Sequence, residues 1–142
     1  MSRPLHMRHN FPAIEALEAG GVDPAALARI APGVDPERLL IREAGPWFER
    51  VVLRGPAAIA LPYVVYVHSR AYNRPRRDLT RLVVHELVHV GQWREEGYVR
   101  FAFRYLWDYL RGRLRGQSHA ESYWSIRYET EARALTAELL AG

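Results

Sequence analysis

The sequence predicts a mostly helical α+β domain in which a small antiparallel sheet packs on one central helix. Apolar residues recur at three- and four-residue spacing at Leu79, Leu82, Val83, Leu87 and Val90, and this pattern predicts the central helix. A second amphipathic helix is predicted over residues 98–115. Two runs rich in Val, Ile, Leu and Tyr, residues 48–54 and 58–67, predict the strands. Because so small a sheet needs a helix to pack on, we expect it to lie against the central helix.

The composition is that of one globular domain. The chain has 142 residues, so we expect residues 1–142 to form a single domain. Hydrophobic residues make up 49% and charged residues 25%, which is typical of globular rather than disordered chains. The net charge of +4 is mild, so we do not expect a nucleic-acid partner. The absence of cysteine excludes disulfides, thiolate metal ligands and cysteine nucleophiles.

Residues 1–10 are predicted to form a flexible tail. They contain no apolar core of the kind found in signal peptides. The longest apolar run, residues 57–67, is too short to span a bilayer. We therefore expect a cytoplasmic protein without a membrane span, with signal-independent export as the open alternative.

Short helices are predicted after the tail. Residues 12–19 form the first, which Gly20 and Gly21 end. Two Gly-Val-Asp-Pro segments follow, at 21–24 and 33–36, and each places an aspartate at a helix cap and a proline at the first helical position.

The β-rich run at residues 58–67 is interrupted by Pro62, so together with residues 48–54 we expect a meander of two or three strands. Two roles are open for this sheet. A peptide could add to its edge as an extra strand, or the strands could only support the central helix.

The C-terminal half is predicted to be helical. Residues 69–77 form an arginine-rich loop, and Asp78 is expected to cap the central helix after Pro75. An apolar stripe of Phe103, Leu106, Leu110 and Leu114 runs along the helix 98–115. A capping box at residues 118–121 begins a last helical region that reaches about residue 140, with a kink near Ser125.

The central helix carries the motif H-E-x-x-H as His85, Glu86 and His89. Positions four apart lie on one face of an α-helix, so both imidazoles can reach one metal ion. Glu86 follows the first histidine and can act as a general base on a water molecule that zinc activates. The sequence therefore predicts one Zn²⁺ ion bound by His85 and His89, rather than two histidines bonded to core carbonyls.

A hydrolytic zinc site needs a third protein ligand. The downstream candidates are Glu95, Glu96, Asp108, His119, Glu121, Glu129, Glu131 and Glu138. The first two lie too near the end of the same helix to fold back, and Asp108 belongs to the arginine-bearing face of the second helix. The last helical region is therefore the expected source of the ligand.

The segments around His85–Gln92 and Tyr128–Ala132 resemble the glutamate zincins, in particular short bacterial zincin-like domains of largely unknown substrate, some associated with contractile injection systems. The resemblance covers roughly residues 57–135. It implies that Glu129, three residues before Ala132, is the third ligand, with Glu131 as the alternative. The larger glutamate zincins often place an aspartate after this alanine, where this chain has Arg133. Gln92, which shares the face of the metal ligands, is the candidate for orienting a ligating histidine.

The motif and the resemblance together predict a zinc metallopeptidase, a hydrolase with a peptide or protein substrate. Glu86 is expected to be the catalytic base. Tyr123, Tyr128 or His119 is expected to donate a hydrogen bond to the developing oxyanion. The alternative is a catalytically weak or inactive zinc-binding module, for example a structural or interaction component of a secretion or injection system. A structural zinc site would use four protein ligands, with His119 as the candidate fourth.

Overall fold

The computed structural model describes residues 10–53 and 55–141, and the predicted tail at residues 1–9 lies outside this range. The elements follow in the order β1 (Phe11–Pro12), α1 (Ala13–Ala19), α2 (Pro24–Ile30), β2 (Leu40–Glu43), α3 (Pro46–Val51), β3 (Ala58–Ala60), β4 (Val64–Val67), α4 (Ser69–Tyr72), α5 (Arg76–Glu96), α6 (Tyr98–Leu114), α7 (His119–Trp124) and α8 (Arg127–Ala141). The fold is α+β and mostly helical, as the sequence predicts.

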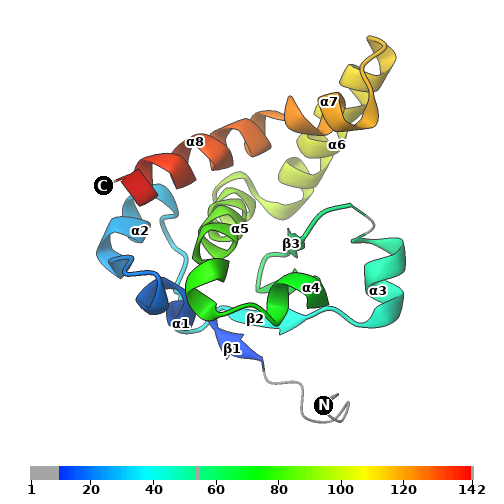
Figure 1. Ribbon diagram of the computed structural model, residues 1–142. Helices are drawn as coiled ribbons and strands as arrows, with labels where there is room; N and C mark the ends of the chain where they lie inside the picture. Colours follow the sequence, from blue (N-terminus) through cyan, green and yellow to red (C-terminus); the bar gives the residue numbers. More distant parts are fainter. Residues whose placement is uncertain (1–9, 54, 142) are drawn as a thin grey trace.

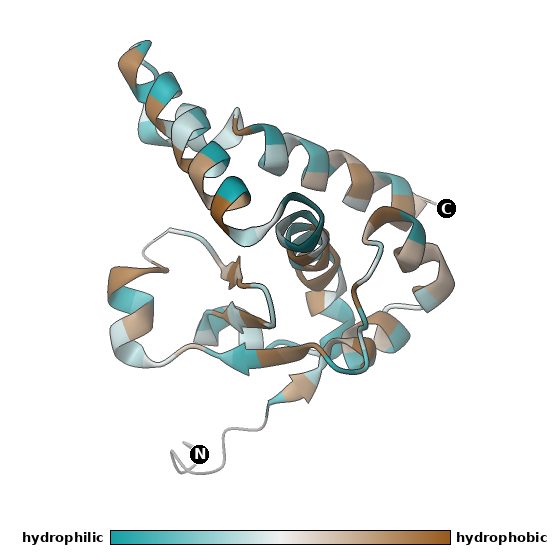
Figure 2. Cartoon of the chain, turned by 180° about the vertical axis from the view of Figure 1, so that it is seen from behind, coloured by the Kyte–Doolittle hydropathy of each residue, from teal (hydrophilic) through white to brown (hydrophobic). Residues whose placement is uncertain are grey.

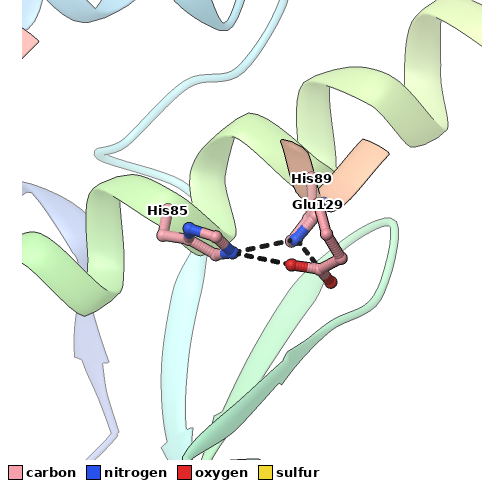
Figure 3. A group of neighbouring side chains, drawn as sticks. All are labelled: His85, His89 and Glu129. Atoms are coloured by element: carbon pink, nitrogen blue, oxygen red, sulfur yellow. Dashed lines mark hydrogen bonds and ion pairs between the residues drawn. The ribbon is translucent and has the colours of Figure 1, made fainter. Parts of the chain in front are cut away.

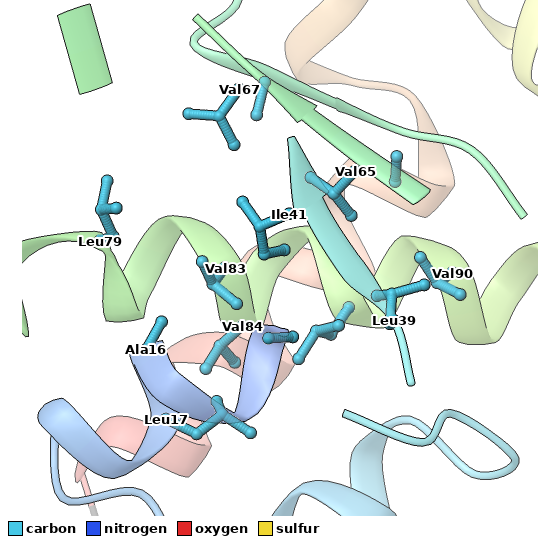
Figure 4. Close-up of a cluster of buried hydrophobic side chains, with 14 of the residues drawn as sticks. Ala16, Leu17, Leu39, Ile41, Val65, Val67, Leu79, Val83, Val84 and Val90 are labelled. Atoms are coloured by element: carbon cyan, nitrogen blue, oxygen red, sulfur yellow. The ribbon is translucent and has the colours of Figure 1, made fainter. Parts of the chain in front are cut away.

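Helix α5 lies at the centre of the molecule, between α8 and the sheet (Figure 1). Its apolar side chains form the main hydrophobic core with residues of α1 and of the strands (Figure 4). Val83, Val84 and Leu87 are almost completely buried there, together with Ile41 and Val65 of the sheet. The predicted packing of the sheet on the motif helix is confirmed, and it holds the motif helix in a fixed position.

The sheet is mixed rather than antiparallel, which corrects the prediction. Its strand order is β1-β2-β4-β3, with β2 parallel to β4 and the other two pairs antiparallel. The run at 58–67 forms β3 and β4 with a turn at the predicted break near Pro62. Residues 48–51 of the other β-rich run belong to helix α3 instead of a strand. Pro46 occupies the first helical position there, where its missing N–H costs nothing, and this local signal outweighs the β-forming side chains.

The two Gly-Val-Asp-Pro segments behave differently. Asp23 caps α2 by accepting a hydrogen bond from the Ala25 N–H at 2.9 Å. Asp35 accepts the equivalent bond from the Glu37 N–H at 2.9 Å, but no α-helix follows. The chain makes one turn and enters β2 at Leu40. The predicted second helix is therefore wrong, because the chain after that turn is paired in the sheet.

The start of α5 also differs from the prediction. Pro75 is the N-cap, and Asp78 lies in the first turn, where its negative charge stabilises the helix by interacting with the helix dipole. The predicted loop at 69–77 contains the one-turn helix α4. Thr80 on α5 donates a hydrogen bond to the Ala16 carbonyl at 2.6 Å, and a Cβ at Gly20 would collide with Thr80. Glycine is therefore needed where the end of α1 approaches α5.

Helices α6 and α7 form an arm that projects from the body (Figure 1). The predicted boundaries of α6 are confirmed to within one residue, and the chain breaks between α7 and α8 at Ser125, where a kink is predicted. The carboxylate of Asp108 binds the Arg127 side chain at 2.8 Å from both Nε and Nη2, and also accepts the Arg127 backbone N–H at 3.1 Å. Asp108 therefore ties α6 to the first residue of α8.

The predicted apolar stripe of α6 is exposed. Its residues Phe103, Leu106, Leu110 and Leu114 have exposed fractions between 43% and 81%. Figure 2 shows hydrophobic residues along this projecting helix. The buried side of α6 instead presents Phe101, whose ring contacts Trp93 and Tyr128 with centroids 4.3 and 4.6 Å apart. The amphipathic pattern predicts the helix correctly but not which of its faces packs on the body.

Two phenylalanines of α6 should therefore differ in their effect on stability. We expect Phe101→Ala to lower the free energy of unfolding by about 3–5 kcal/mol, because it removes a buried ring. The matched change Phe103→Ala should alter it by no more than about 0.5 kcal/mol, since that ring is 70% exposed. Urea unfolding followed by circular dichroism measures both. Equal losses in the two variants would contradict this assignment of faces.

Candidate metal centre

Three side chains from two helices meet beside the sheet (Figure 3). His85 and His89 project from the same face of α5, one turn apart, and Glu129 reaches them from the first turn of α8. His85 Nε2 lies 3.0 Å from Glu129 Oε2, and His89 Nε2 lies 3.1 Å from Glu129 Oε1. The two histidine Nε2 atoms are 3.2 Å apart. These three residues form a group that could hold a metal ion.

The spacing of the donor atoms fits a small tetrahedral ion. Ligands at about 2.0–2.1 Å from zinc in tetrahedral geometry stand about 3.3 Å from one another. The two imidazole nitrogens, 3.2 Å apart, are close to this value, and each nitrogen lies 3.0 to 3.1 Å from one of the two oxygens of Glu129. One donor atom from each of the three residues lies within 4.8 Å of the other two. Two imidazole nitrogens and one carboxylate oxygen are also a donor set that divalent transition metals accept. The residues present therefore fit a metal ion both in spacing and in chemistry.

Glu131, the alternative third ligand, does not join this group. It is exposed, and its Oε1 accepts a hydrogen bond from Gln92 Nε2 at 3.3 Å. Residues two apart on a helix point in different directions, so only one of the two glutamates can face the histidines. Glu129 faces them and is 3% exposed.

Gln92 holds the ring of His89. Its Oε1 lies 2.7 Å from His89 Nδ1, and its Nε2 donates to the Tyr128 carbonyl at 3.1 Å. The bond to the carbonyl fixes the amide so that its oxygen faces the imidazole, and His89 Nδ1–H must be the donor. His89 Nε2 is thereby turned towards His85 and Glu129, as a metal ligand requires. The structure thus gives Gln92 the orienting contact that the sequence suggests for it.

A change at Gln92 should weaken metal binding without removing a ligand. We expect Gln92→Ala to lower zinc affinity by about 10- to 100-fold, because His89 loses the bond that orients it. Competition against a chromogenic chelator measures this, and Glu95→Gln, an exposed change on the same helix, is the control. Unchanged affinity in Gln92→Ala would show that the bond does not matter for the metal.

Charges within the group favour an ionised Glu129. Burial by itself would raise the pKa of Glu129, but hydrogen bonds with His85, His89 and Tyr105 outweigh burial and lower it. Burial would lower the pKa of His89, yet the hydrogen bond to Glu129 and the charge of Glu86 raise it to about 9. A metal ion must therefore displace a proton from His89 at neutral pH.

Glu86 is buried beside the ligands, at 6% exposure. Burial raises the pKa of its carboxyl, although His89, His85 and a hydrogen bond from the Ala60 backbone lower it.

The backbone of Ala60 in β3 is bonded to side chains of α5. Its N–H group bonds Glu86, and its carbonyl accepts a hydrogen bond from Trp93 Nε1 at 3.0 Å. At Ala60, the outer edge of β3 is thus occupied by side chains of α5. These contacts show that β3 supports the motif helix at this residue.

Two tyrosines complete the surroundings of Glu129. Tyr105 on α6 donates its hydroxyl to Glu129 Oε1 at 2.8 Å. Burial and the charge of Glu129 raise the pKa of Tyr105 and of Tyr123 well above the usual range, so both hydroxyls keep their protons. The sequence pattern of the predicted helix 98–115 does not single out Tyr105. Its role depends on how α6 packs against α8, and no local pattern indicates that.

The structure separates the three candidate oxyanion donors. Tyr123 lines the cavity beside the metal group. Tyr128 does not line it: its ring is buried against Phe101, and it contributes only its backbone carbonyl to Gln92. His119 is exposed at the start of α7, with Nδ1 2.7 Å from the Tyr109 hydroxyl. Of the three candidates, only Tyr123 lines this cavity among the described residues, because Tyr128 packs in a hydrophobic cluster and His119 lies on the arm.

A mostly apolar cavity of about 260 Å³ opens onto the group. Glu86, His89, Tyr105, Tyr123 and Glu129 are its polar residues. Its other walls come from residues 52, 53, 56 and 58–60, from Trp93 and from residues 101 and 102 of α6. The buried acid and the metal-binding atoms thus face a space that a small part of a substrate can enter.

Comparison with known proteins does not extend this description. No family model, no curated protein and no solved structure matches the chain. Among the described helices, none combines the length and the apolar character needed to cross a membrane.

Proposed function

We propose that this chain is a zinc-dependent hydrolase that cleaves a peptide bond. The observation that carries the proposal is the convergence of His85, His89 and Glu129 with donor atoms 3.0–3.2 Å apart, beside the buried carboxyl of Glu86. This is the arrangement of ligands and base that the resemblance to the glutamate zincins implies. Two imidazoles and one carboxylate are a ligand set of hydrolytic zinc sites, which keep one position for water or substrate.

A zinc ion bound there would supply a Lewis acid that polarises a water molecule and the scissile carbonyl. Glu86 takes the proton from the attacking water and delivers it to the amine nitrogen as the C–N bond breaks. A pKa raised by burial brings its carboxyl closer to neutral pH, where accepting and returning a proton are both accessible. The products are then a carboxylate and a free amine.

Tyr123 is the side chain that we assign to the oxyanion. It lines the cavity, and its hydroxyl keeps its proton next to the charges of Glu129 and Glu86. A protonated hydroxyl can donate to the negative charge that develops on the carbonyl oxygen. Tyr105 acts differently: its bond to Glu129 Oε1 positions the third ligand.

The contacts of His119 argue against a zinc with a purely structural role. Such a zinc would have four protein ligands. The metal-binding group found among the described residues has three, and His119 is bonded to Tyr109 instead. Three ligands beside a cavity favour hydrolysis over a structural module.

Removal and return of the metal test this proposal. We expect the purified protein to contain about one equivalent of zinc, to lose peptidase activity when the zinc is chelated, and to regain it with added zinc. Metal analysis and cleavage of a quenched fluorescent peptide library measure the two quantities. Activity that persists in metal-free protein would overturn the proposal.

A further inference from the structure

A second cavity, of about 530 Å³, lies on the other side of Glu86. It shares Pro56, Ala58, Glu86 and Tyr123 with the apolar cavity, so the two cavities adjoin at the carboxyl of Glu86, and together they are called the groove, each forming one half. His85 lines this second half, whereas His89 and Glu129 line the first. A substrate that reaches Glu86 can therefore extend into both halves.

Arginines dominate the second half of the groove. Arg81 lies one turn before His85 on α5, and Arg133 lies one turn after Glu129 on α8. Arg70 and Arg74 line it as well, from α4 and the residues that follow it. Its acidic lining residues are only Asp78 and Glu86. The charge at this end of the groove is positive, in contrast to the mostly apolar first half.

None of these arginines forms an ion pair with a carboxylate within the described part of the chain. Arg74 and Arg81 are exposed and have no carboxylate partner there. Arg70 donates to the Gly55 carbonyl at 3.1 Å. Arg133 stacks over Trp124 at 3.6 Å and donates to its carbonyl. Guanidinium groups left without an acid are available for an anionic group of a ligand.

Two buried polar atoms at the same place also lack partners. Nη1 of Arg133 and Oγ1 of Thr136 have no hydrogen-bond partner among the described residues, and Thr136 is 1% exposed. Both residues line this half of the groove. Buried polar atoms are normally bonded, so unpaired atoms in the wall of a cavity indicate that a ligand or water completes them.

We infer that the arginine-lined half of the groove binds a carboxylate of the peptide substrate, close to the scissile bond. The carboxylate is either an acidic side chain or the C-terminal carboxylate of the peptide, and an apolar side chain on the other side of the bond enters the first cavity. A planar guanidinium holds a carboxylate through two parallel bonds, which fixes the peptide in register past Glu86. The inference rests on the proposed function, because it assigns the substrate class of the same site.

Peptide binding to the full chain with Glu86→Gln tests the inference without turnover. The probes are fluorescein-labelled polyalanine octapeptides with one phenylalanine at position 4. Glutamate or glutamine stands at position 2 or at position 6, and the C-terminus is free or amidated. We expect one probe with a carboxylate to bind about tenfold more tightly than its uncharged counterpart in fluorescence anisotropy. A preference for glutamate identifies the side chain as the source, and a preference for the free terminus identifies the C-terminal carboxylate.

Arginine variants in the same background locate the carboxylate. The double change Arg74→Gln and Arg81→Gln should reduce the preference below about threefold. Arg77→Gln, an exposed change on α5 that does not line the groove, should leave it intact. Equal binding of charged and uncharged probes, or equal loss in the Arg77 control, would overturn the inference.

The two proposals fail in different ways. If the zinc-loaded wild type cleaves peptides but shows no carboxylate preference in cleavage or binding, the groove assignment is wrong and the hydrolase remains. If Glu86→Gln binds with the preference while the wild type cleaves none of the probes or library peptides, the hydrolase is wrong and the carboxylate site remains.

Discussion

Glu86→Gln is expected to lower kcat for peptide cleavage by about 10²- to 10⁴-fold and to leave the zinc content unchanged. Glutamine has almost the same shape, and its amide oxygen can still accept the hydrogen bond that the Ala60 backbone gives to Glu86. The amide cannot accept a proton from water, so the base is lost while the fold and the ligands remain. Glu86 is not among the three residues of the metal-binding group, which is why metal binding should persist.

The control for this experiment is Glu95→Gln on the same helix. Glu95 is exposed and does not line either half of the groove. It makes the same chemical change and should keep full activity. Metal analysis, circular dichroism and initial rates on one peptide separate loss of base from loss of zinc or fold. Normal turnover in Glu86→Gln would rule out Glu86 as the base.

The second large effect is expected at the third ligand. Glu129→Gln should lower zinc affinity by at least about 100-fold, because the charged carboxylate whose two oxygens face the two histidines is replaced by a neutral amide. Glu131→Gln makes the identical change two residues away and should shift affinity by less than about threefold, since Glu131 is exposed and accepts a hydrogen bond from Gln92 rather than facing the histidines.

Competition with a chromogenic chelator at fixed pH measures both constants. Loss of zinc in Glu131→Gln to the same extent as in Glu129→Gln would show that the ligand is assigned to the wrong glutamate. Circular dichroism of the metal-free variants checks that Glu129→Gln, which removes a buried charge, still folds.

The parts of this site that lie on one helix could be predicted from the sequence. His85, Glu86, His89 and Gln92 fall on α5, and the 3.6-residue period alone puts the two histidines and Gln92 on one side of it. Glu129 is 44 residues from His85, so its place at the site follows only from the resemblance and from the packing of α8 on α5. Tyr105 and the arginines of the groove depend entirely on tertiary packing, which no local period encodes.

The errors in the fold have a similar origin. Leu40–Glu43 is a four-residue strand with alternating burial, too short to stand out from a loop, and its parallel pairing with β4 is a non-local choice. The α6 stripe is a correct amphipathic pattern, yet the face that packs is the one with Phe101, Asp108 and Gly112. Asp108 is buried because Arg127 neutralises it, and a hydrophobicity pattern cannot contain that pairing.

The ion pair between Asp108 and Arg127 couples the position of the arm to the candidate metal centre. Arg127 is two residues before Glu129, and Tyr105, one turn before Asp108, bonds the same glutamate. Any displacement of α6 from the body would break the Asp108–Arg127 ion pair and the hydrogen bond from the Tyr105 hydroxyl to Glu129 together. Metal binding and docking of the arm would therefore be thermodynamically linked: if docking of the arm raises metal affinity by some factor, metal binding favours docking by the same factor.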